Sequence, residues 1–436
     1  MQNIRHHLGF LLGLLLCSSA YAQNIDKADT AWILVSTCFV IFMVVGLAFF
    51  YGGLVRSKNA LNTMMMSFIA LGVVGITWAV IGYSLAYADG NIFFGYLDHF
   101  LLRNVGLQAD GIPLILDWAF QGGFAIITAA LISGAVVERM RFSAYMLFIT
   151  IWSVLVYAVM AKWVWGGGLF EFEGVAFLHK AYDFAGGTVV HINAATAALV
   201  LTLMIGKRKD FGRKAMLPHN VPFTLLGAGI LWVGWFGFNA GSAYGANEIA
   251  ALALANTLLA PAATIAAWAT LDFIRANKIT AVGLATAIVV GLVAITPAAG
   301  LVSPISAILI GIIASLPSYF FIEWRANTGL DDSLDVFGAH GLAGIIGALL
   351  TGVFISSNWG GDVNGSWTQF VSQLVAVLIA ITYSALASFL IASFVRLFFP
   401  LRSQENQEAA GLDLVSHGEE AYTDGEGAVL LAVAGD

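Results

Sequence analysis

Residues 183–206 read DFAGGTVVHINAATAALVLTLMIG, a run of small and apolar residues. A helix needs about 20 such residues to cross the hydrocarbon core of a bilayer. One residue in this run is unexpected, because His191 lies eight residues into the segment, where an ionisable side chain is costly and usually functional. The stretch therefore predicts a transmembrane helix and makes His191 the first candidate functional residue.

The rest of the chain has the same apolar character. Of its 436 residues, 59% are hydrophobic and 10% are charged, and the mean hydropathy is +0.86. Such a composition excludes a soluble protein, whose surface must face water, and predicts an all-α integral membrane protein. Apolar stretches separated by short polar breaks predict eleven transmembrane helices, at about residues 31–54, 62–87, 115–137, 143–165, 184–206, 221–241, 249–274, 280–297, 305–322, 336–355 and 368–395.

The N-terminus has the pattern of a targeting segment. Basic residues at 5–7 precede the apolar run LGFLLGLLLC, and SSAYA then supplies small residues. This pattern is typical of a signal peptide that is cleaved off as residues 1–22. The alternative, a lipid anchor on Cys17, is weaker because Leu16 stands where a small residue is expected. Removal of the signal would leave Cys38 as the single cysteine, which excludes an intramolecular disulfide and a thiol metal cluster.

Positive charges are unequally divided between alternate loops, which predicts the orientation. By the positive-inside rule the mature N-terminus lies outside and, after an odd number of helices, the C-terminus lies inside. We therefore expect a membrane domain at 23–396 and a cytoplasmic tail at 397–436. The richer loops hold Arg56, Lys58, Arg139, Arg141, Lys207, Arg208, Lys209, Arg213, Lys214, Arg275, Lys278 and Arg325, and the poorer loops hold Lys27, Arg103, Lys162 and Lys180.

A second histidine has a similar setting in the tenth helix. DFAGGTVVH opens the fifth helix and DVFGAH, ending at His340, opens the tenth; in each an acid is followed by glycine and then histidine. Helices five apart run in opposite directions, which indicates an inverted repeat with a substrate path at its interface. His191 lies roughly 12 Å and His340 roughly 7 Å from opposite membrane surfaces, so the two imidazoles could largely close the gap between them.

Two facing imidazoles suit a small polar solute better than a metal ion. No Cys, Asp or Glu stands at ligand spacing beside either histidine, so we expect no metal site. A neutral imidazole carries one donor and one acceptor, and the pair can order a solute or pass a proton. The alternative is a pair of core histidines bonded to backbone carbonyls. Asp183 and Asp335 begin the two helices and are first explained as N-caps, although Asp183 could also favour a cation at the outer mouth.

Aromatic residues of three other helices complete the pattern. Phe120 and Phe124 lie one turn apart, Trp165 precedes three glycines, and GWFGFNAGS contains Phe238 and Ser242 near the outer end of the sixth helix. An open indole face can hold a cation, and this cation–π interaction contributes about 2 kcal/mol when the cation is desolvated. Phenylalanines on a lumen can form a constriction that an ion crosses poorly and a neutral molecule crosses well.

These motifs resemble the ammonium transporter family in order and spacing. The resemblance runs from about Asp26 through the tail, and it implies a homotrimer of eleven-helix protomers in the inner (plasma) membrane, each with a pore built on an inverted repeat of its first ten helices. It implies neither an enzyme nor a cofactor nor a nucleic-acid partner. The matching stretches are QGGFAIITAALISGAVVERMRFSA, WVWGGG, DFAGGTVVHINAA, GWFGFNAGSA, ANEIAALA, DVFGAHGLAG and GLDLVSHGEEAY.

The resemblance also implies roles for individual residues and a partner. A trimeric PII-type signalling protein docks on the cytoplasmic face of bacterial members, with the GLDLVSHGEEAY tail packed under the pore; a solvated acidic tail is the alternative. Trp165, Phe120 and Ser242 would form the outer ammonium site, Phe124 and Phe238 the gate, His191 and His340 the twin histidines of the pore, and Asp183 a support for the outer site.

The sequence thus predicts selective ammonium uptake, in which the cation loses its proton and crosses as ammonia. An ammonium sensor with little transport is the alternative, which an appended signalling domain would favour. A passive pore for carbon dioxide or water leaves Trp165 without a role. Two segments depart from the family: the loop 171–182 is longer than the usual connection, and TDGEGAVLLAVAGD at 423–436 has no counterpart.

Overall fold

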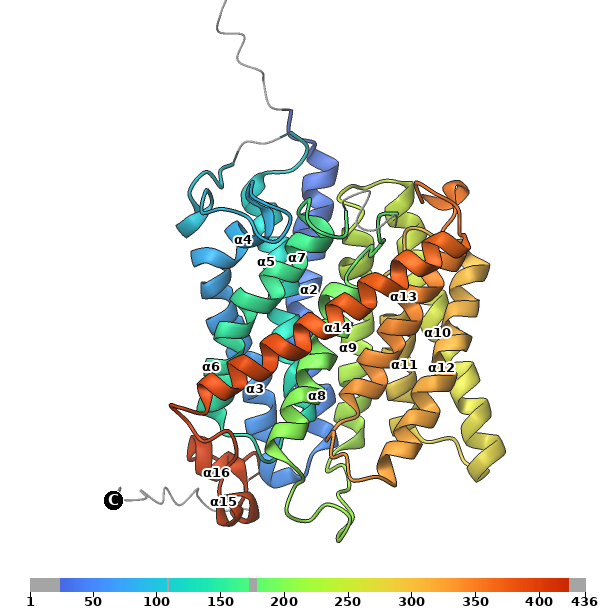
Figure 1. Cartoon of the computed structure of the whole chain (residues 1–436). Coiled ribbons are helices and arrows are strands. Elements are labelled where there is room, and N and C mark those ends of the chain that lie inside the picture. Colours follow the sequence, from blue (N-terminus) through green and yellow to red (C-terminus); the bar gives the residue numbers. More distant parts are fainter. Residues whose placement is uncertain (1–23, 108–109, 172–178, 423–436) are drawn as a thin grey trace, which may run out of the picture.

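The computed structural model describes residues 24–107, 110–171 and 179–422. The expected signal peptide, most of the loop 171–182 and the final residues 423–436 lie outside this described part. Figure 1 shows an all-helical molecule whose helices run between two faces. We call the face that holds the start of α2 (Lys27–Leu54) the upper face, and the face that holds α15 (Glu405–Ala410) and α16 (Leu412–His417) the lower face.

Each of the eleven predicted apolar segments is helical, with boundaries within a few residues of those expected. Within the described residues ten helices are long and apolar enough to cross a membrane, and Ala281–Ile295 is a shorter apolar helix. The remaining helical elements of the described residues are η1 (Ser57–Asn59), α3 (Ala60–Thr77), η2 (Trp78–Gly82), α4 (Tyr83–Tyr87), η3 (Phe100–Leu102), α5 (Leu114–Leu131), η4 (Ile132–Ala135), α6 (Phe142–Trp152), η5 (Ser153–Tyr157), α7 (Ala158–Trp165), η7 (Gly187–Ile192), α8 (Asn193–Ile205), α9 (Val221–Gly241), α10 (Glu248–Ala276), α11 (Ala281–Ile295), α12 (Pro304–Ala326), η8 (Phe337–Leu342), α13 (Ala343–Phe354), η9 (Ser357–Trp359) and α14 (Trp367–Val395).

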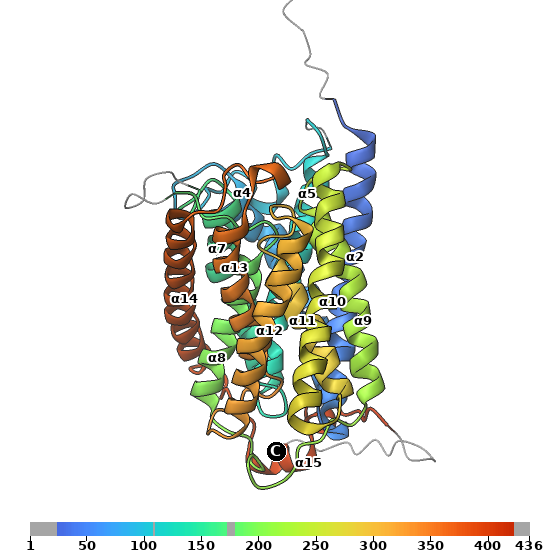
Figure 2. The same ribbon diagram turned by 90° about the vertical axis from the view of Figure 1, so that its right-hand side faces the viewer.

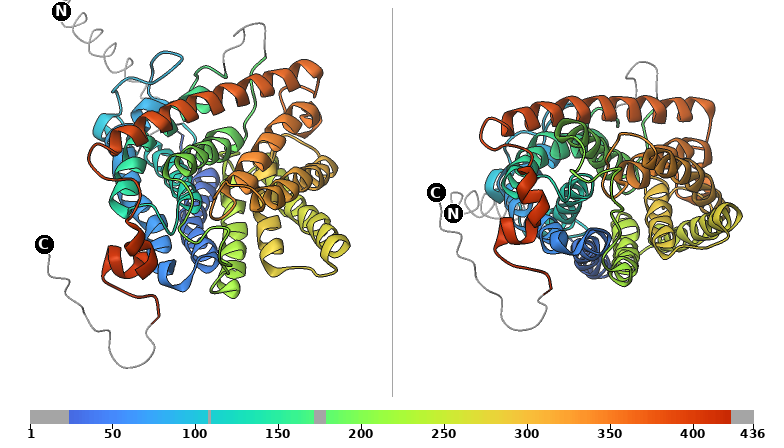
Figure 3. Two further views of the ribbon diagram at one scale, coloured as in Figure 1. Left: turned by 60° about the horizontal axis from the view of Figure 1, so that its bottom comes forward. Right: turned by 90° about the horizontal axis from the view of Figure 1, so that it is seen from below.

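The helices surround a central region, and α14 crosses one side of the molecule. Seen from below, helices of the first and second halves form two groups, and α14 runs along both (Figure 3). It packs against α6, α8 and α13. Figure 2 shows α2 and α9 at the opposite edge. The last apolar helix therefore bridges the two halves of the chain.

Helices α2 and α9 approach closely because glycines of α9 face α2. A Cβ atom added at Gly237 of α9 would lie 2.6 Å from the Cβ of Phe39 in α2, closer than real Cβ contacts. Apolar packing drives little association between helices in lipid, so close backbone contact of this kind supplies the dispersion energy.

The tail is packed against the lower face at residues 411–413 rather than solvated, whereas residues 418–422 are exposed. The carboxylate of Asp413 accepts hydrogen bonds from the backbone N–H groups of Leu61 and Asn62, at the start of α3. The Lys58 ammonium donates to the carbonyls of Glu408 and Ala409. These bonds satisfy helix-end groups that otherwise lack partners. The tail thereby becomes part of the folded body.

Candidate functional site

His191 and His340 meet in the middle of the molecule. Their Nδ1 atoms lie 3.3 Å apart, and their rings stack with centroids 5.3 Å apart and an interplanar angle of 23°. The two side chains are 1% and 2% exposed. Two Nδ1 atoms can share only one proton in such a contact, so one ring donates and the other accepts. The sequence prediction that these two residues face each other is confirmed.

Both histidines lie in π-helical turns that begin their helices. His191 is in η7, where its backbone N–H donates to the carbonyl of Gly186, and His340 is in η8. A π turn widens the helix and turns the side chain relative to a regular α-helix, and such turns are frequent at functional sites. The matching distortion turns both rings into the same space.

A carboxylate fixes the start of each of these turns. The oxygens of Asp183 accept hydrogen bonds from the backbone N–H groups of residues 186–189, at 2.6–3.1 Å. Asp183 is 8% exposed, and burial raises the pKa of its carboxyl although the four N–H groups oppose this shift. Asp183 thus caps the helix of His191, as predicted.

The corresponding residue at the second helix is Asp332, so the N-cap prediction for Asp335 was wrong. Asp332 accepts hydrogen bonds from the backbone N–H groups of Val336 and Phe337. Asp335 instead pairs with Arg325, with 2.5 Å between Oδ1 and Nε, and its backbone φ is 59°. Its side chain therefore does not reach the helix end. Asp332 precedes His340 by eight residues, the same spacing as from Asp183 to His191, and this spacing could have identified it.

The space beside the histidines is narrow and apolar. The cavity measures about 10 Å³, which is about the least that holds one water-sized molecule. The Nε2 atom of His191 is buried and has no hydrogen-bond partner, so it is free to contact a solute. The cavity is lined, besides the histidines, by Met43, Leu47, Phe50, Ile127, Leu131, Val190, Leu231, Trp235, Phe238 and Val289.

Trp235 supports the ring of His191 from the far side. The two rings stack with centroids 5.2 Å apart and an interplanar angle of 17°, and the indole Nε1 donates to the hydroxyl of Thr296. The sequence located Trp235 in the sixth transmembrane helix but gave no sign of this contact, because the two residues come from different helices. Stacking and the hydrogen bond together fix the imidazole plane.

An aromatic column continues upward from the histidines. The rings of Phe124 and Phe238 stack with centroids 4.1 Å apart and an interplanar angle of 21°, and His191 contacts Phe238 at 6.1 Å. Phe120 and Trp165 then meet Phe124 edge-on, at 5.0 Å and 6.0 Å. The stacked pair therefore lies between the ring of His191 and the ring of Trp165.

Trp165 and Ser242 lie above this stack and are half-buried. The Trp165 indole donates from Nε1 to the carbonyl of Asp183 at 2.8 Å, so Asp183 fixes both a histidine helix and this indole. The hydroxyl of Ser242 donates to the carbonyl of Phe238, which leaves its oxygen available as an acceptor. Aromatic faces with a hydroxyl acceptor suit a small cation that donates hydrogen bonds.

Charged residues on the lower face close the opposite end of the molecule. Glu138, 1% exposed, binds Arg56 at 2.9 Å and Arg208 at 2.6 Å, and Arg208 also binds Asp331. Burial alone would raise the pKa of Glu138, but the charges of Arg208 and Arg56 outweigh it and lower the pKa to about 2. We call Arg56, Glu138, Arg208 and Asp331 the lower ion cluster.

A metal centre has no support in the described residues. Within ranges 24–107, 110–171 and 179–422 no group of three or more His, Cys, Asp or Glu residues could hold a metal ion.

The chain is similar to transport proteins along almost its whole length. Residues 31–422 match the Ammonium Transporter Family. An ammonium transporter of Aquifex aeolicus (strain VF5) is 48% identical over 95% of this chain and 99% of the relative. An ammonium transporter of Bacillus subtilis (strain 168) is 43% identical over 92% of this chain and 99% of the relative.

Solved structures share the fold. The crystal structure of Candida albicans Mep2 superimposes with a TM-score of 0.81 at 34% identity, over 88% of each chain. A structure described as a sensor Amt protein gives a TM-score of 0.84 at 27% identity, over 90% of this chain and 98% of the other. The arrangement of the helices, the facing histidines and the match over 31–422 agree, and the chain belongs to the ammonium transporter family.

Proposed function

We propose that this transporter takes up ammonium by removing one proton at the upper mouth and conducting ammonia past His191 and His340. The upper mouth is the group formed by Phe120, Trp165 and Ser242. As a member of its family it is a multi-pass ammonium transporter of the plasma membrane and not an enzyme. The observation that carries the mechanism is the histidine pair, with Nδ1 atoms 3.3 Å apart, in an otherwise apolar cavity. An ion cannot exchange its water for ligands there, whereas a neutral molecule needs only the imidazole nitrogens.

The upper mouth would bind the cation before it loses its proton. Trp165 and Phe120 offer aromatic faces and Ser242 an acceptor oxygen, and these attract a cation. Asp183 has its carboxylate directed at four backbone N–H groups, so its part is to fix Trp165 and to offset positive charge from a distance. The Phe124–Phe238 pair would act as the gate below this site.

Selection against potassium follows from the same chemistry. Potassium has no proton to leave behind, and the cavity has no ring of oxygen ligands to replace its water. Ammonia can accept a hydrogen bond from one imidazole and donate to the other. The histidines would order ammonia in the cavity or pass the separated proton.

The wider assembly is also part of the proposal. The upper face would lie outside and the lower face in the cytoplasm, as the positive-inside rule predicts for the inner membrane. The shared Asp–His spacing of eight residues supports an inverted repeat of the first ten membrane helices. Family resemblance supports a homotrimer with a pore in each subunit. It also supports a division into a signal peptide (1–22), a membrane domain (23–396) and a cytoplasmic tail (397–436).

A PII-type signalling protein is the proposed cytoplasmic partner. The lower face combines a docked acidic tail with exposed basic residues such as Lys209 and Lys214, which gives a partner both charges to recognise. Binding there would cover the lower mouth. A pull-down with purified PII-type protein should lose signal when residues 403–436 are deleted.

Replacement of the histidines tests the transport mechanism. The variant with both His191→Ala and His340→Ala should lose ammonium transport or lose its preference for ammonium over potassium, because no polar group remains in the cavity. His219→Ala is the control, since His219 lies in a loop of the lower face. Uptake that stays selective and unchanged in the double variant would contradict the proposal.

A sensor function is the second candidate, since one solved relative is described as a sensor Amt protein. A sensor would bind ammonium at the same upper mouth and alter the lower face without net transport. Purified protein in liposomes separates the two candidates, because a sensor gives neither a current nor internal alkalinisation beyond that of protein-free liposomes.

A further inference from the structure

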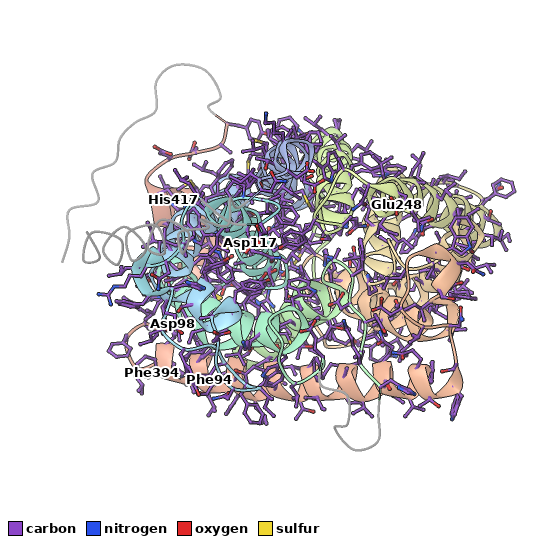
Figure 4. The ribbon with its side chains drawn as sticks, turned by 90° about the horizontal axis from the view of Figure 1, so that it is seen from above. Phe94, Asp98, Asp117, Glu248, Phe394 and His417 are labelled. Atoms are coloured by element: carbon purple, nitrogen blue, oxygen red, sulfur yellow. The ribbon has the colours of Figure 1, made fainter. Side chains whose placement is uncertain are left out.

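A second carboxylate lies at the upper face, outside the aromatic column. Asp117 is in the first turn of α5, and its label in Figure 4, which looks onto the upper face, lies inside the rim of the molecule. Oδ2 accepts a hydrogen bond from the Tyr83 hydroxyl at 2.5 Å, and Oδ1 accepts one from Tyr244 at 2.7 Å. Gln121 donates from Nε2 to the Tyr244 oxygen at 2.6 Å.

These hydrogen bonds favour the ionised form of Asp117. The Tyr244 hydroxyl oxygen accepts from Gln121, so its own proton is directed to Asp117. Two hydroxyl donors stabilise a carboxylate over a protonated acid. None of the ion pairs formed among the described residues includes Asp117. A partly buried carboxylate without a positive partner is costly, and a bound cation would offset that cost.

Open acceptor atoms and aromatic faces surround the same point. Gln121 is 5% exposed, and its Oε1 has no hydrogen-bond partner. The buried hydroxyl of Tyr87 also has no partner, and the Tyr87 ring lies 5.3 Å from that of Tyr83. Trp78 contacts both rings. One carboxylate, neutral oxygens and aromatic walls suit a monovalent cation rather than a divalent one.

The hydrogen-bonded group of Asp117, Gln121 and Tyr244 is connected to the proposed upper mouth. Asp117 and Phe120 lie one turn apart on α5, where side chains at i and i+3 are neighbours. The ring of Tyr244 packs edge-on against Phe120, with centroids 5.7 Å apart, and Tyr244 is 37% exposed. A cation at Asp117 would therefore lie beside the ring that borders the transport path and close to solvent.

We propose that Asp117, Gln121, Tyr83, Tyr87 and Tyr244 form a second site for a monovalent cation, which holds ammonium beside the upper mouth and supplies it to the site at Phe120 and Trp165. The supply step rests on the proposed transport function, whereas binding of the cation does not. The role of Asp117 is to concentrate the substrate through its negative charge.

Thallium(I), a monovalent cation with strong anomalous scattering, tests the binding directly. Crystals of the full chain soaked in thallium(I) should show an anomalous peak within contact of the Asp117 carboxylate. Asp117→Asn, which keeps the shape and one acceptor oxygen, should remove the peak, and Gln121→Leu should weaken it while Asp117 keeps its charge. A wild-type crystal without the peak, or a peak that persists in Asp117→Asn, would overturn the proposal.

Transport kinetics test the supply step. Asp117→Asn should raise the ammonium concentration for half-maximal current about tenfold, the lower end of the gain that a local charge gives to substrate concentration. The change in half-maximal concentration should exceed the change in maximal current. The change in half-maximal concentration should also become smaller in 1 M choline chloride, because the Debye length there is about 3 Å and the charge of Asp117 is screened. An equal loss of maximal current at every ionic strength would show a structural role and contradict the supply step.

The double histidine variant separates this proposal from the transport mechanism. It should keep the thallium(I) peak at Asp117 even though it has lost selective transport. If the peak is present in both proteins while transport is unaffected by the histidines, the cation site stands and the pore mechanism fails. If the peak is absent from both proteins, the cation site is refuted and the transport mechanism is unaffected.

Discussion

His191 and His340 meet because carboxylates at the starts of their helices fix the backbone. The oxygens of Asp183 bind four consecutive N–H groups, including that of Gly187, so the π turn begins at a defined residue. The motif DFAGGTVVH predicted both the histidine and its cap. The motif DVFGAH suggested Asp335 as the second cap, but Asp332 binds these N–H groups. Asp332 shares with Asp183 the spacing of eight residues to the histidine, and this signal could have identified it.

Removal of the Asp183 carboxylate should destabilise the protein strongly. Asp183→Ala leaves four buried N–H groups without an acceptor, and one such group costs about 1–3 kcal/mol. We expect a loss of at least ~2 kcal/mol and a lower thermal midpoint, measured by tryptophan fluorescence in detergent. Asp26→Ala is the matched control, since Asp26 caps α2 at the exposed surface and should cost about 1 kcal/mol. Equal losses in both variants would contradict this account.

The helices themselves follow from hydropathy, whereas their local distortions do not. Eleven apolar runs predicted eleven helices because a lipid-exposed backbone must satisfy its own hydrogen bonds. The π turns η7 and η8 leave no periodic signal, because their residues are almost all buried and no polar face shows the shift in phase. The tail is a similar case. Asp413 binds N–H groups of α3 more than 350 residues away in the sequence, and the tail's acidic composition also fits a solvated segment.

Docking of α16 should depend on Asp413. Asp413→Ala removes the acceptor for the N–H groups of Leu61 and Asn62, so α16 should open more often. We expect its amide hydrogens to exchange at least ~10-fold faster, which corresponds to a loss of about 1.4 kcal/mol. Hydrogen exchange read by mass spectrometry measures this change. Glu405→Ala is the control, because Glu405 in α15 is 75% exposed; a similar increase in that variant would refute the assignment.

The lower ion cluster should stabilise the protein at neutral pH and lose this contribution in acid. Glu138 has a folded pKa of about 2 and an ordinary value of 4.5, so its contribution is fully present above pH 4.5 and is lost as the pH falls towards 2. A shift of this size corresponds to about 3 kcal/mol. The unfolding midpoint of Glu138→Gln should lie below that of the wild type at pH 7, and the difference should narrow below pH 4.5. A constant difference from pH 3 to pH 7 would contradict the assigned pKa.

The complete molecule joins two apolar halves around one narrow path. Composition and charge distribution predicted a membrane protein and its orientation, and the motifs predicted which helices supply the path. The sequence did not predict that α14 would run along both halves (Figure 3) or that Trp235 would stack on His191, because both depend on packing between segments distant in the chain. The two facing histidines were thus identifiable from the sequence, and the contacts that support them were not.

Selective conduction is the central claim, and an ammonium pulse on purified protein in liposomes tests it most directly. Current and internal pH are recorded together and the response of protein-free liposomes is subtracted, because ammonia also crosses lipid unaided. A pulse of ammonium should then give either a saturable current or internal alkalinisation, while an equal pulse of potassium should give neither. A current would mean that the proton follows ammonia, and alkalinisation alone would mean that ammonia crosses without it. An equal response to potassium, or no response to ammonium in either record, would contradict the account.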